Sequence, residues 1–86
     1  MIVHVGSVLY SYTANEPEVE AEGATLGAVL DDLEQRHPGL RFRVVDEQRQ
    51  VRQHMNVFVN GRPTRDLRTR LDPSDEVHIL QALSGG

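Results

Sequence analysis

One amphipathic segment constrains the fold of this chain more than any other feature. Thr25 is typical of a helix N-cap, and apolar residues recur after it at i, i+3, i+4 and i+7, namely Leu26, Val29, Leu30 and Leu33. The sequence His37-Pro38-Gly39 ends the pattern, because proline cannot continue a helix and glycine suits its exit. The sequence therefore predicts one helix with a single apolar stripe, which has to be buried against the rest of the chain.

Two strand patterns precede this helix. Residues 2–12 are rich in isoleucine, valine, leucine and tyrosine and are interrupted at Gly6-Ser7, which predicts a strand with a bulge. Residues 13–16 have the composition of a turn, and residues 17–22 alternate acidic and apolar side chains as a half-exposed antiparallel strand does. Together they predict an N-terminal hairpin.

The pattern is least distinct directly after the helix. Residues 40–45 fit either a short strand or a loop pinned by Leu40 and Phe42, and residues 46–50 are polar and expected to be exposed. A clearer strand follows at residues 55–59.

A hairpin turn is predicted immediately after that strand. Asn60-Gly61 is a strong two-residue turn signal, and residues 62–64 extend the chain briefly beyond it. Residues 65–71 fit a turn of helix, with Leu67 and Leu71 spaced i, i+4. Turn residues at positions 72–75 then lead into the last strand.

The last strand leads into a pair of glycines. Apolar residues continue to Leu83 and are followed by Ser84, Gly85 and Gly86. Glycine has no Cβ, so such a tail could enter a channel too narrow for other residues, and the group it presents is the α-carboxylate. A terminal glycine pair arises by chance in roughly 0.5% of chains, and chain ends are often disordered or carry cloning residues. Its position directly after a predicted strand favours a functional tail.

Composition limits the function classes. The 86 residues predict one domain at residues 1–83, with residues 84–86 as a flexible tail. The chain lacks cysteine, which excludes disulfides and thiol chemistry, and its net charge of −4 argues against a nucleic-acid partner. We find neither an apolar run long enough to span a bilayer nor a signal peptide, so we expect no membrane association and a cytoplasmic location.

The order of elements is strand, strand, helix, strand, short strand or turn, strand. This predicts an α+β protein in which one main helix packs on one face of a mixed sheet, the β-grasp or ubiquitin-like arrangement. In that arrangement the first and last strands lie side by side and parallel.

With these elements in place, the chain resembles the ThiS/MoaD family of sulfur-carrier proteins over nearly its whole length. The resemblance is carried by the N-terminal hairpin, the helix starting at residues 25–30, the strand and turn at residues 57–61, and the strand from residues 75–77 to Gly85-Gly86.

The resemblance implies a mechanism centred on the tail. A ubiquitin-activating-type (ThiF/MoeB-like) enzyme would use Mg-ATP to adenylate the carboxylate of Gly86. A sulfur donor would then displace AMP, and the resulting thiocarboxylate would supply a sulfur-accepting synthase. The chain would be a carrier and not an enzyme, with no bound cofactor of its own.

Several alternatives remain open at this stage. The acceptor pathway is of the molybdopterin, cysteine or thiamine type, and length and ending look more like the carriers that serve cysteine synthesis. The chain could instead be a ubiquitin-like modifier joined through Gly86 to lysines of other proteins, or a plain β-grasp binding module.

Two further groups of side chains are candidate sites. Phe58 and Leu80 would form a docking patch for partner enzymes if they lie on the open face of the sheet, with Leu83 and Ser84 beside it. Packing of Phe58 under residues 40–53 is the alternative. His4 and His78 would be neighbours if the first and last strands pair, but without a nearby acidic ligand we expect no metal site. The acidic pairs Asp31-Asp32 and Asp75-Glu76 are interpreted as solvated surface groups.

Overall fold

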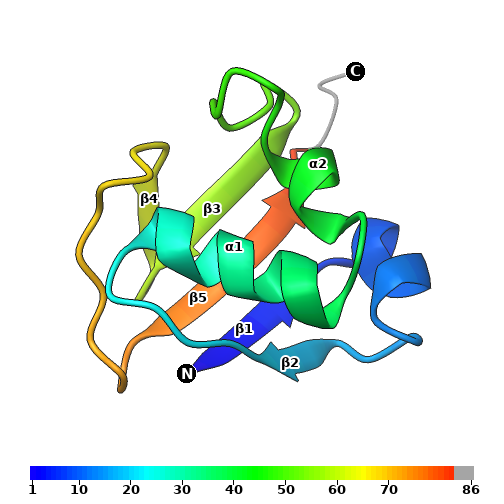
Figure 1. Ribbon diagram of the computed structural model, residues 1–86, viewed down its shortest axis with the longest axis horizontal. Coiled ribbons are helices and arrows are strands. Elements are labelled where there is room, and N and C mark those ends of the chain that lie inside the picture. The colour runs from blue at the N-terminus through cyan, green and yellow to red at the C-terminus, as the bar shows by residue number, and fades with distance from the viewer. Residues whose placement is uncertain (83–86) are drawn as a thin grey trace.

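A computed structural model describes residues 1–82. It contains a five-stranded mixed sheet in the order β2-β1-β5-β3-β4, with helix α1 lying across one face (Figure 1). The elements in chain order are β1 Ile2–Val5, the 3-10 helix η1 Ser7–Tyr12, β2 Glu18–Glu20, α1 Leu26–Arg36, α2 Leu40–Val44, β3 Met55–Val59, β4 Arg62–Thr64 and β5 Glu76–Gln81.

The first and last strands form the centre of the sheet, as predicted. β5 pairs in parallel with β1, where Val3 lies opposite Val77, and in antiparallel with β3, where Val57 lies opposite Ile79. All four of these side chains are buried, so they face the helices, and the residues between them form the open face. This arrangement is the predicted β-grasp.

Helix α1 is formed and capped as predicted. The Thr25 hydroxyl accepts a hydrogen bond from the Ala28 N–H at 3.2 Å, and the four stripe residues are buried. Burying each such side chain contributes up to about 1.5–3 kcal/mol, so this stripe is a major part of the core. Gly39 (φ 94°) then adopts a left-handed conformation that starts the next helix.

The N-terminal strand is shorter than predicted. It ends at Val5, the Gly6 N–H donates to the Ile79 carbonyl, and residues 7–12 turn into the 3-10 helix η1. The prediction of a bulged strand over residues 2–12 was wrong. The 3-10 helix instead packs the Leu9 side chain into the core, where it is 1% exposed. The second strand keeps its predicted alternation, with Val19 buried between exposed glutamates.

Residues 40–44 form a helix, α2, and neither a strand nor a loop. Leu40 and Val44 are spaced i, i+4 and both are buried, which fixes the helical turn against α1. Leu40 anchors the segment as expected, but Phe42 does not, because it is 54% exposed. The exposed polar turn expected at residues 46–50 is present and is closed by a bridge between Val45 and Val51.

The second half of the chain follows the prediction in part. Asn60 (φ 51°) and Gly61 (φ 85°) form the predicted hairpin turn between β3 and β4. Residues 65–71 are not helical. Instead they form a loop with a turn at residues 67–68, and its Leu67 and Thr69 carbonyls accept hydrogen bonds from the first amides of α1.

Within residues 1–82 there is no helix of the length and apolar character that a membrane crossing needs. The division between domain and tail at residues 83–84 and the cytoplasmic location stay predictions.

Candidate functional site

The candidate reactive group is the carboxylate of Gly86, five residues after β5 ends at Gln81. Gly85 and Gly86, together with Leu83 and Ser84, lie outside the described residues. What is described is the base from which this segment leaves the domain. β5 lies in the middle of the sheet, and its last residue, Gln81, pairs with Met55 of β3.

The hydrogen bonding of β5 persists to the last described residue. The Ala82 N–H donates to the His54 carbonyl at 2.7 Å, one residue before β3 begins. On the opposite side, pairing with the N-terminal strand ends where the Gly6 N–H meets the Ile79 carbonyl at 2.9 Å. β5 is thus bonded on both sides as far as Ile79, and on the β3 side as far as Ala82, where the C-terminal segment leaves the domain.

Helix α2 and the start of β3 lie near this exit (Figure 1). The Arg52 guanidinium carbon lies 4.5 Å from the centroid of the exposed Phe42 ring, and Arg52 Nε donates to the Phe42 carbonyl. The pair presents an apolar and a positively charged surface together. The sequence analysis missed it, because Phe42 was expected to point inward.

The predicted docking residues lie on the open face of the sheet. Phe58 is half-buried and alternates with the buried Val57, so it faces away from α1 and not under residues 40–53. Leu80 is 38% exposed on the adjacent strand, one diagonal step from Phe58 across the pair Phe58–His78. Their role in partner binding stays a prediction.

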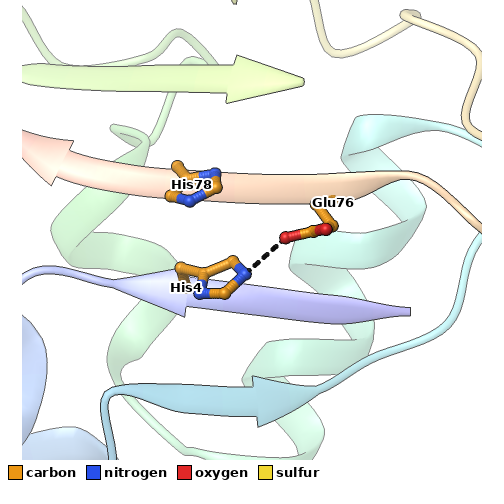
Figure 2. Close-up of side chains that lie close together, drawn as sticks. All are labelled: His4, Glu76 and His78. Atoms are coloured by element: carbon orange, nitrogen blue, oxygen red, sulfur yellow. Dashed lines mark hydrogen bonds and ion pairs between the residues drawn. The ribbon is translucent and has the colours of Figure 1, made fainter. Parts of the chain in front are cut away.

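The two strand histidines meet as predicted, and they have acidic neighbours that the sequence analysis missed. The rings of His4 and His78 are stacked, with centroids 4.2 Å apart and an interplanar angle of 8°. His4 Nε2 lies 2.8 Å from a Glu76 carboxylate oxygen (Figure 2). His4 Nδ1 lies 3.3 Å from a Glu18 carboxylate oxygen. The premise that no acidic ligand lies nearby was therefore wrong. The sequence signal for these neighbours was the alternation of Glu18 and Glu76 with buried valines, which places both carboxylates on the open face with His4.

The acidic pairs set aside as surface groups serve the fold. Asp31 accepts hydrogen bonds from Arg41 at 2.7 Å and from Arg49 at 3.1 Å, and the Arg41 bond is the main cause of its lowered pKa. The pKa of Asp75 is lowered chiefly by the hydrogen bond that its carboxylate accepts from the Asp72 N–H, and further by the Asn60 amide. Both carboxylates are held in their charged form, which suits structural roles and not proton transfer.

The fold and the position of the C-terminal strand define a ubiquitin-like protein. Comparison with known proteins specifies the family, because the model of the ThiS family matches residues 5–86. The chain belongs to the ThiS family.

Its relatives include both carriers and modifiers. Sulfur carrier protein CysO from Mycobacterium tuberculosis is 35% identical over 98% of this chain and 96% of the relative. A chain in the crystal structure of the Amycolatopsis orientalis BexX/CysO complex superposes with a TM-score of 0.90 at 34% identity, covering 99% of this chain and 98% of that one. Small archaeal modifier protein 3 from Haloferax volcanii is 38% identical over 76% of this chain and 73% of its own length. Homology thus joins this chain to a class of small carriers that are not themselves enzymes.

Proposed function

We propose that this protein is a sulfur carrier whose reactive atom is the carboxyl carbon of Gly86. The observation that carries the proposal is homology to CysO over the whole chain, together with a family match that extends to residue 86. The hydrogen-bonded exit of β5 is consistent with this role, because it gives the C-terminal segment a fixed base.

The chemistry proceeds in two substitutions. A carboxylate oxygen of Gly86 attacks the α-phosphorus of ATP and expels pyrophosphate, which yields an acyl-adenylate. Hydrosulfide from the sulfur donor then attacks the carbonyl carbon, AMP leaves with the bonding electron pair, and loss of the S–H proton gives the thiocarboxylate. The activating enzyme supplies Mg²⁺, which neutralises the phosphate charge. The carrier contributes its terminus and a docking surface.

Chain length sets how closely an activating enzyme must approach. Residues 83–86, even if fully extended, span at most about 14 Å. An adenylating active site must therefore come within that distance of Ala82. A ThiF/MoeB-like enzyme satisfying this limit would touch the surface around the exit of β5, where we propose that Phe58, Leu80, Leu83 and Ser84 contribute to docking.

For the acceptor, we favour a synthase of the cysteine type, because the whole-length relatives are CysO proteins. The molybdopterin and thiamine types remain the alternatives. The BexX/CysO complex is a case in which a relative forms a complex with another protein.

Intact-mass spectrometry tests the carrier function. The protein, untagged at its C-terminus, is incubated with ATP, a candidate adenylating enzyme and a sulfide source. We expect a mass gain equal to one oxygen-to-sulfur exchange, localised to Gly86 by fragmentation. Deletion of Gly86 should abolish the gain while circular dichroism stays unchanged. Glu16→Gln, at an exposed position in the turn before β2, is the control variant that should retain the gain. An exchange that persists after the deletion would refute the proposal.

A second function is favoured by the modifier relative. Conjugation through Gly86 to lysines of other proteins shares the adenylation step, and small archaeal modifier protein 3 is a homologue. Host cells can be searched for higher-mass species that contain this protein. Their disappearance on deletion of Gly86 would favour conjugation. A second copy of the protein could not be joined to this chain through a lysine isopeptide bond, because its nine Lys and Arg positions are all arginine.

A further inference from the structure

A row of four side chains, three of them polar, crosses the open face of the sheet. The registers of β2, β1, β5 and β3 place Glu18, His4, His78 and Phe58 opposite one another in that order. Glu76 lies one step along β5 from this row, on the same face as the histidines and away from the helices (Figure 2). Three strands, β2, β1 and β5, thus bring two imidazoles and two carboxylates together.

His4 has more carboxylate neighbours than a neutral imidazole can satisfy with hydrogen bonds. Its Nδ1 faces Glu18 and its Nε2 faces Glu76. A neutral imidazole carries a single N–H, so it can donate to only one of these two carboxylates. A cation placed between nitrogen and oxygen would satisfy the other contact.

We propose that His4, Glu76 and His78 bind one divalent transition-metal ion of the zinc class. One nitrogen from each imidazole and one oxygen from the carboxylate all lie within 4.8 Å of one another. Tetrahedral zinc, with bonds of about 2.0–2.2 Å, separates its ligand atoms by roughly 3.4 Å. The 2.8 Å contact between His4 and Glu76 has to widen by about 0.6 Å, and the longer separations have to shrink by up to about 1.4 Å. Because the two rings are stacked nearly parallel, at least one of them also has to rotate before both nitrogen lone pairs point at one ion.

The surroundings permit that adjustment. The Glu76 side chain is 59% exposed, so its carboxylate can change rotamer at low cost. A shallow hollow of about 390 Å³, lined in part by His4, Glu18 and Glu76, opens this edge of the cluster to solvent. It gives an ion a route of approach and leaves the fourth coordination position to water.

Glu18 acts as a positioning residue in this site. Its carboxylate oxygen lies 3.3 Å from His4 Nδ1 and so favours the tautomer that carries its proton on Nδ1, whose Nε2 lone pair faces the metal. Carboxylates behind a ligating histidine have this effect widely, and their loss typically lowers metal affinity by about 10–100-fold. Imidazole ligands favour Zn²⁺, Ni²⁺, Cu²⁺ and Co²⁺ over Mg²⁺ or Ca²⁺.

Titration calorimetry with ZnCl₂ on untagged, chelator-treated protein tests the site. We expect saturable binding of one ion per chain. His4→Gln, His78→Gln and Glu76→Gln should each lower the affinity at least about tenfold, and Glu18→Gln by about 10–100-fold. Absorption of the Co²⁺-substituted protein should show the intense visible bands of tetrahedral coordination.

His54→Gln is the matched control. His54 is exposed and lies outside the cluster, so its replacement should leave the affinity unchanged. Circular dichroism establishes that each variant is folded, and Glu76→Gln, which alters a mostly exposed side chain, keeps the test decisive if a histidine variant unfolds. Absence of saturable binding, or equal losses in His54→Gln and His4→Gln, would overturn the proposal.

Discussion

Gly23 offers a sharp test of how the N-terminal hairpin packs on α1. A Cβ added at Gly23 would lie 2.6 Å from the Val29 nitrogen and 2.8 Å from the Ala28 carbonyl carbon. Ordinary contacts begin near 3.4 Å, so the backbone of one segment would have to move by roughly 0.8 Å. Both obstructing atoms belong to the helix backbone, which cannot rotate away.

The expected cost of Gly23→Ala follows from three terms. Overpacking costs about 1–3 kcal/mol, and a shift at the start of α1 endangers the Thr25 cap, worth about 1 kcal/mol. Reduced entropy of the unfolded chain returns about 0.4–1 kcal/mol. The net destabilisation is about 1–3 kcal/mol, and each kcal/mol lowers Tm by roughly 4–8 °C in a domain of this size.

Gly6→Ala is the matched control. Its backbone (φ −75°, ψ 165°) suits alanine, and an added Cβ would approach Leu80 no closer than 3.4 Å. Only the unfolded-state term applies, so Tm should stay the same or rise slightly. Differential scanning calorimetry on both variants decides the matter. Equal Tm changes in the two variants would refute the packing of residue 23 on α1.

Two further predictions concern charge and docking. Asp31→Asn should reduce the free energy of unfolding at pH 7 by less than about 1 kcal/mol, because the carboxylate that bonds Arg41 is half exposed. The pKa of Asp31 is lower in the folded state than its usual 3.8, so the stabilisation is present above pH 3.8 and is lost as pH falls through the folded value. Urea unfolding should therefore show a difference between wild type and variant at pH 7 that disappears at the acid end, and a difference that persists there would contradict this account. Phe58→Ala should keep the fold but slow thiocarboxylate formation measured by mass, whereas Ile2→Ala, an exposed position on β1, should not. Equal rates for both variants would remove Phe58 from the docking surface.

The parts of the fold that could be predicted carry their signals locally. Helix α1 has its cap, stripe and stop within one stretch, and Asn60-Gly61 adopts the backbone its sequence favours. The predictions failed for short elements that contribute only a few apolar residues to the core. Val8 to Tyr12 have a strand-like composition, and Leu40 with Val44 is too brief a repeat to separate a helix from a strand. Whether these segments form a helix or a strand depends on how they pack against the rest of the core.

The candidate sites divide in the same way. The importance of Gly86 could be inferred because a tail needs no tertiary partner. The proximity of His4 and His78 could be predicted because the first and last strands of a β-grasp pair in parallel. Glu18 and Glu76 were missed because their approach to His4 depends on the register of three strands, which a one-residue slip would reverse.

Strand β5 connects the two surfaces on which the proposals depend. It holds the C-terminal segment through the Ala82 N–H, and it carries Glu76, His78 and Leu80 on the open face. A partner that docks on Leu80 and Phe58 would therefore contact the strand that leads to the reactive carboxylate, next to the proposed metal ligands. An ion bound at His78 would place positive charge beside Phe58, its neighbour in the sheet. Metal binding and enzyme docking would then compete for one face, which makes the effect of Zn²⁺ on the rate of thiocarboxylate formation the measurement that joins them.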